Sequence, residues 1–179
     1  MNNENKENFA KNVFGALLVD LPERDASIPA MLVEGKSYRT TWAPEDADGV
    51  VRIIDQRRLP FRFELADLRT VEQVVVAIKD MWVRGAGCIG AAAGFGMWLA
   101  AREAAAENPG SPEKFASAFR SLAETLRTAR PTAVNLSWAV DRQLAAVEAA
   151  GPDLSAKVAA ALAEARAIAD EDAAACRSI

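Results

Sequence analysis

The sequence contains no histidine. Imidazole is the usual general base of enzymes and a common zinc ligand, so its absence excludes catalytic triads that depend on histidine and His-based metal sites within this chain. Only two cysteines are present, Cys88 and Cys176. They are too few for a disulfide framework and too far apart for a zinc-binding pair. We therefore predict no metal site and interpret both cysteines as free, buried thiols in a reducing compartment.

Long runs of one charge are also missing. The net charge is −4, with acidic and basic residues interspersed, so the electrostatic pattern of a nucleic-acid-binding protein is absent. The uncharged stretch 85–101 is slightly short for a membrane span and rich in glycine and alanine, which predicts a buried helix instead. The first residues lack the apolar segment of a signal peptide. We expect a cytoplasmic protein that does not insert into membranes.

Aromatic residues are sparse, at 7% of the chain, but several fall in short alternating segments near the N-terminus. Residues 1–35 contain helix-breaking prolines and are expected to be an extension that packs loosely or is partly disordered. One domain should then cover 36–179. β-Branched and aromatic residues predict strands at 38–42, 50–55 and 62–65, separated by proline and glycine turns. These strands suggest a small three-stranded antiparallel meander.

Helical spacing of apolar residues continues from Arg69 to the end of the chain. Thr70 and Gln73 have the spacing of a capping box at the first helix. Breaks at glycine and proline divide the region into about five helices, which start near residues 71, 87, 112, 131 and 152. The predicted fold class is α+β, a meander beside a helix bundle. The last helix has no stop signal before Ile179, which we interpret as a truncation or cleavage point.

The segment Arg84–Gly90 is the first candidate site. Its small residues, Gly85 and Ala86 among them, would let backbone amides approach a ligand at the start of a helix, where an anion is favoured. Arg84 could contact the same phosphate with two N–H groups. Alternatively, the glycines permit close helix packing and Arg84 caps a nearby carbonyl. The spacing matches neither a Walker loop nor a dinucleotide fingerprint.

Arg130 precedes another predicted helix, with Thr132 and Asn135 in its first turns. An arginine at a helix N-terminus opposes the dipole unless an anion lies between them. A second phosphate-facing position is therefore plausible, although a surface ion pair explains the residue almost as well. The polar segment Asp55–Pro60 is interpreted as a solvated turn.

These segments together resemble one family, over about residues 37–179. They include Y-R-T-T-W, I-D-Q-R-R-L-P, L-R-T-V-E-Q-V, R-G-A-G-C-I-G, A-x-R-P-T-A-V-N-L-x-W and E-D-A-A-A-C-R-S-I, in that order. This series of motifs resembles methylthioribose-1-phosphate isomerases, which are related to regulatory subunits of translation initiation factor 2B. It implies interconversion of 5-methylthioribose 1-phosphate and 5-methylthioribulose 1-phosphate in methionine salvage, without metal or organic cofactor.

The resemblance also implies a two-domain enzyme in which a Rossmann-like second domain, absent here, holds a catalytic cysteine and aspartate. No catalytic residue is then expected in this chain, which should be inactive alone. It should work with the C-terminal half of the same protein and as a homodimer. The resemblance implies that four residues of this chain contact the phosphate or the sugar, namely Arg84, Gly85, Ala86 and Arg130.

Two departures from the family pattern stand out. Gly87–Cys88 replaces a segment that usually contains proline, and Cys176 stands where asparagine is usual. A related sugar 1-phosphate is therefore an open alternative for the substrate. A different class of protein is open as well, namely a non-catalytic module that binds a sugar phosphate or nucleotide, or assembles with a partner.

Overall fold

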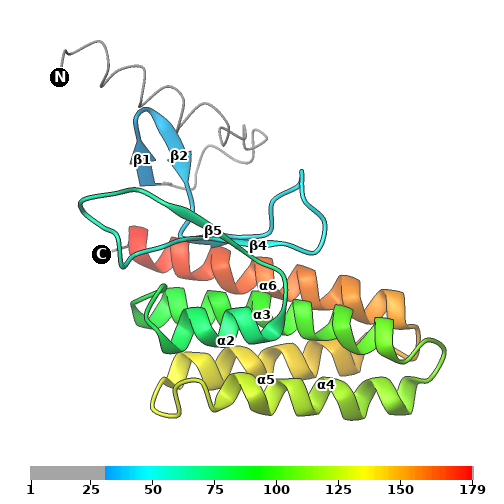
Figure 1. Cartoon of the computed structure of the whole chain (residues 1–179). Helices are drawn as coiled ribbons and strands as arrows, with labels where there is room; N and C mark the ends of the chain where they lie inside the picture. Colours follow the sequence, from blue (N-terminus) through cyan, green and yellow to red (C-terminus); the bar gives the residue numbers. More distant parts are fainter. Residues whose placement is uncertain (1–30, 179) are drawn as a thin grey trace, which may run out of the picture.

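The structure, a computed structural model, describes residues 31–178. Most of the predicted extension, residues 1–30, lies outside this range. Short strands come first in the chain and form a layer on one side of a helical bundle, with α6 next to the strands and α4 and α5 on the far side (Figure 1). The elements are β1 (Met31–Val33), β2 (Lys36–Tyr38), β3 (Thr41–Trp42), β4 (Val51–Ile54), β5 (Leu65–Leu68), α2 (Val71–Lys79), α3 (Ala86–Glu107), α4 (Pro112–Arg127), α5 (Val134–Ala149) and α6 (Leu154–Arg177). The α+β prediction is confirmed.

The three-stranded antiparallel meander is also confirmed, in the order β3–β4–β5. The predicted first strand is in fact divided: residues 36–38 pair with β1 in a separate hairpin, and only 41–42 pair with β4. The hairpin spans the boundary that we expected between residues 35 and 36. On β4 the buried Arg52 lies opposite Asp67 of β5, and its guanidinium donates two hydrogen bonds, of 2.6 and 2.9 Å, to that carboxylate.

The third strand was predicted three residues too early. It runs from Leu65 to Leu68. Phe61, which alternates with Phe63 and Leu65 in the sequence as on a half-buried strand, is 92% exposed. The chain before Leu65 forms a connection in which Arg62 donates its backbone N–H to the carbonyl of Arg58 at 2.9 Å. An exposed connection can therefore have the same alternating sequence pattern as a half-buried strand.

Within residues 31–178 there are five helices, as expected, and the capping of α2 follows the prediction. Gln73 donates its backbone N–H to the Thr70 hydroxyl at 3.2 Å, while its side chain accepts a bond of 2.6 Å from the backbone N–H of Arg69 rather than of Thr70. The start of α5 differs, since Pro131 lies in a turn and the helix begins only at Val134.

Helix α3 is the centre of the bundle and packs against α2, α4, α5 and α6. Residues 88–101 are all buried, as expected for the uncharged stretch. The fully buried Gln143 of α5 ties three helices together, because its Nε2 donates bonds of 3.0 Å to the carbonyls of Gly94 in α3 and Ala161 in α6. Within residues 31–178, no helix combines the length and apolar character that crossing a bilayer requires.

Candidate functional site

The start of α3 has the backbone geometry of an anion-binding site. Gly85 is its N-cap residue with a φ of 91°, a conformation that favours glycine, and no side chain caps the helix. The first amides of a helix have no partners within the helix, and the dipole favours negative charge there. The first turn of α3 can therefore donate backbone hydrogen bonds to an anion.

A cavity of about 650 Å³ lies at this helix start. Arg84, Gly85 and Ala86 line it, so three of the four predicted site residues share one wall. The segment from Tyr38 to Thr41 forms a second wall, and the last turns of α6 form a third. The cavity is thus built by segments that are far apart in the sequence and meet where α3 begins.

The Arg84 side chain is exposed at the edge of the cavity. Its Nε donates a long hydrogen bond of 3.4 Å to the carbonyl of Met81, so the alternative role of capping a neighbouring carbonyl is partly realised. Among residues 31–178 no carboxylate forms an ion pair with Arg84. The outer N–H groups of the guanidinium therefore remain available for a ligand, and they can contact a phosphate in a two-pronged arrangement.

Arg130 occupies a different place. It is half-buried before α5, and its carbonyl accepts the backbone N–H of Ala133 at 2.9 Å. It lines neither the large cavity nor a smaller one of about 230 Å³ beside it. Asn135, from the same segment, does line the smaller cavity.

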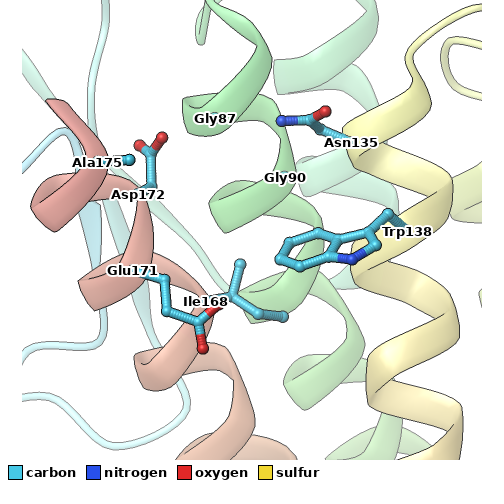
Figure 2. Close-up of a pocket in the computed structure, with 8 residues that line it drawn as sticks. All are labelled: Gly87, Gly90, Asn135, Trp138, Ile168, Glu171, Asp172 and Ala175. Carbon is cyan, nitrogen blue, oxygen red and sulfur yellow. The ribbon is translucent and has the colours of Figure 1, made fainter. Parts of the chain in front are cut away.

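The smaller cavity lies between α3, α5 and α6. Figure 2 shows Asn135 and Trp138 of α5 across from Ile168 and Asp172 of α6, with Gly87 and Gly90 between them. Gly87 and Asp172 line both cavities. Burial raises the pKa of the Asp172 carboxyl above its usual value. Asp172 was not among the predicted site residues: the segment E-D-A-A-A-C-R-S-I contributes to the family resemblance, but nothing in it distinguishes Asp172 from the two acidic residues before it.

Cys88 is buried on the wall of the large cavity, as predicted for a free thiol. Burial raises the pKa of its thiol, although hydrogen bonds from the side chains of Thr40 and Gln56 oppose the shift. A neutral thiol is a poor nucleophile. Cys176 lines the same cavity but is exposed, so the expectation of two buried thiols is wrong for Cys176.

The segment after β4 supports the start of α3. Asp55 is 5% exposed and accepts two hydrogen bonds, of 2.9 and 2.7 Å, from the Arg57 guanidinium, which holds the pKa of this carboxyl below its usual value. Arg57 also stacks over the ring of Trp82 at 4.1 Å. The neighbouring Gln56 reaches Cys88, with 3.5 Å between Nε2 and Sγ. The interpretation as a solvated turn is therefore wrong for Asp55.

Together, these features define a class: an α+β domain in which a helix start without a side-chain cap lies beside an arginine that has no ion pair among residues 31–178. Comparison with known proteins identifies the family within this class. Residues 82–179 match the model of the initiation factor 2 subunit family. The chain belongs to this family.

The similar proteins include two functional branches. Methylthioribose-1-phosphate isomerases from Methylorubrum extorquens and Gluconobacter oxydans are 46% and 41% identical over 149 and 142 residues, covering 83% and 79% of this chain. This chain spans only 38% and 36% of those relatives. The crystal structure of 5-methylthioribose 1-phosphate isomerase from Pyrococcus horikoshii matches 74% of this chain and 36% of its own, with a TM-score of 0.66 and 41% identity. The delta subunit of translation initiation factor eIF-2B from A. fulgidus matches 75% of this chain and 37% of its own, with a TM-score of 0.67 and 35% identity.

Proposed function

We propose that this chain is the N-terminal portion of an aldose–ketose isomerase that converts 5-methylthioribose 1-phosphate into 5-methylthioribulose 1-phosphate, a step of methionine salvage. The observation that carries the proposal is the cavity at the uncapped start of α3, lined by Arg84, Gly85 and Ala86. The proposed substrate is the one that the similar isomerases are named after. The protein is proposed to be cytoplasmic and homodimeric.

Phosphate binding is the role proposed for this chain. The first amides of α3 donate hydrogen bonds to the phosphate oxygens, and the Arg84 guanidinium adds charge-assisted bonds from the edge of the cavity. Gly85 allows the phosphate to approach the backbone closely, since it has no side chain. Arg130 is proposed to contact the substrate as well. Because it lies outside both cavities, its contact requires the remainder of the protein or a second copy.

Proton transfer between the first two sugar carbons is assigned to the part of the protein beyond this chain. The chain has no histidine, and the buried Cys88 thiol has a raised pKa, which disfavours the thiolate. The similar isomerases are more than twice as long as the matched region, which leaves room for a second domain. We therefore expect this chain to bind substrate and to lack turnover by itself.

The test compares the isomerase activity of the 179-residue chain with that of the protein extended beyond Ile179. The chain alone should show no turnover, and the extended protein should be active. Arg84→Ala in the extended protein should raise KM at least tenfold, as expected for the loss of a charge-assisted contact. Arg120→Ala is the matched control, since Arg120 is exposed on α4. Unchanged kinetics in Arg84→Ala would refute the phosphate-binding role.

A non-catalytic regulatory module is the second candidate, favoured by the similarity to the eIF-2B delta subunit. Such a module would bind a sugar phosphate or nucleotide at the same helix start without converting it. Binding of the sugar phosphate by the extended protein, with no turnover, would select this function over the isomerase.

A further inference from the structure

Three consecutive acidic residues near the end of α6 have different partners. Asp170 Oδ1 lies 2.6 Å from Arg39 Nη2, an ion pair whose angles fall outside hydrogen-bond geometry. Glu171 accepts hydrogen bonds of 2.5 and 3.0 Å from Arg142. Asp172 has neither an ion pair nor a hydrogen bond to any other residue within 31–178. Asp170 and Glu171 therefore hold α6 to the rest of the fold, whereas Asp172 has no partner among the described residues.

The Asp172 carboxylate lies directly against the start of α3. A Cβ on Gly87 would be 1.6 Å from its Oδ1, so the carboxylate occupies space that only glycine leaves open. Asp172 also lines both cavities, and burial raises its pKa. A partly desolvated carboxylate without a partner is unfavourable. A hydroxyl donor supplied by a ligand would relieve this cost.

The position beside an anion-binding helix start has a chemical consequence. An unpaired carboxylate repels an inorganic phosphate ion or a phosphate ester without other polar groups. The same carboxylate accepts a strong hydrogen bond from a hydroxyl that the phosphate ester carries close to its phosphate. The pair formed by Asp172 and the start of α3 thus favours ligands that carry both groups.

We propose that Asp172 is a specificity-determining residue that accepts a hydrogen bond from the sugar hydroxyl next to the phosphate-bearing carbon. This role rests on the proposed function, because it needs the phosphate at the start of α3. It goes further by assigning the recognition of the sugar hydroxyl to this chain. The ligand class is a sugar 1-phosphate with a free 2-hydroxyl, and its 2-deoxy counterpart is discriminated against.

Calorimetric binding to the 179-residue chain tests the role with three ligands: 5-methylthioribose 1-phosphate, its 2-deoxy counterpart and inorganic phosphate. The wild type should prefer the hydroxylated sugar over the deoxy sugar by about tenfold, the discrimination expected of one hydrogen bond to a charged group. Asp172→Asn should remove most of this preference and bind inorganic phosphate more tightly. Glu171→Gln, a matched change at the preceding residue, should keep the wild-type preference.

The outcomes separate the two proposals. If Arg84→Ala weakens the binding of every ligand while Asp172→Asn leaves the tenfold preference intact, the phosphate site stands and the role of Asp172 is refuted. If none of the three ligands binds the wild type, or if Arg84→Ala changes nothing, the site at α3 is refuted, and the role of Asp172 with it. Circular dichroism of each variant confirms that a lost preference does not come from unfolding.

Discussion

Replacing Gly87 with alanine should displace the Asp172 carboxylate without removing its charge. The added Cβ would lie 1.6 Å from Oδ1 and 2.4 Å from Cγ of Asp172. Both atoms belong to the end of a side chain that can rotate to another rotamer. We therefore expect the carboxylate to swing away while α3 and α6 keep their positions.

Two opposing contributions determine the effect on stability. Alanine in place of glycine at a compatible helical position stabilises by about 0.4–1 kcal/mol, because the unfolded chain loses conformational freedom. Forcing the Asp172 side chain out of its preferred rotamer costs about 0.5–1.5 kcal/mol. The free energy of unfolding of Gly87→Ala should therefore stay within about 1 kcal/mol of the wild type. In an Asp172→Ala background, only the favourable contribution remains, and Gly87→Ala should stabilise by about 0.4–1 kcal/mol.

Urea unfolding of the wild type, the two single variants and the double variant measures this coupling directly. Gly87→Ala should also lose the preference for the hydroxylated sugar, as Asp172→Asn does, although its charge is unchanged. A loss of more than about 2 kcal/mol in both backgrounds would show that the backbone, rather than the carboxylate, obstructs the added methyl group.

Three further changes test the electrostatics and the core. Asp172→Asn should be more stable than the wild type at pH 7, because burial raises the pKa of the Asp172 carboxyl. This advantage should shrink as the pH falls toward about 3.9, the ordinary pKa of an aspartate. A stability difference in urea titrations that does not change with pH would contradict this. Asp55→Asn should be less stable than the wild type at pH 7, because Arg57 lowers the pKa of the Asp55 carboxyl. The difference in stability between the two proteins should disappear, not grow, as the pH falls below about 3.9. Gln143→Ala should cost about 2–4 kcal/mol, because it opens a cavity and removes both hydrogen bonds from Nε2. Gln143→Met also loses these bonds but fills the cavity, so it should recover part of the loss. Equal losses of the two variants in thermal unfolding would contradict the cavity argument.

The helical part of the fold was predictable because its signals are local. The capping residue Thr70 and the break at 108–110 each act on their immediate neighbours, and both mark helix ends in the structure. The uncharged stretch 85–101 similarly predicts a helix that is buried on every side. Arg84, Gly85 and Ala86 could be placed at a cavity for the same reason, since glycine and arginine at a helix start are recognisable from sequence alone.

The sheet and the rest of the site depend on contacts that the sequence does not display. The position of β5 is set by its register with β4, in which Ile54 pairs with Leu65. Periodicity does not contain this information, since Phe61 continues the alternating pattern of the strand and is nevertheless exposed. Asp172 becomes part of the site only because α6 packs against the start of α3. Arg130 has the same local signal as Arg84, yet the packing leaves it outside both cavities.

The central claim is that a sugar phosphate binds at the start of α3. Titrating the ¹⁵N-labelled chain with 5-methylthioribose 1-phosphate and following its backbone amides by NMR tests this most directly. We expect the largest shifts at Gly85, Ala86 and Gly87, and their loss in Arg84→Ala. Shifts concentrated on another face of the molecule, or shifts at α3 that persist in Arg84→Ala, would contradict it.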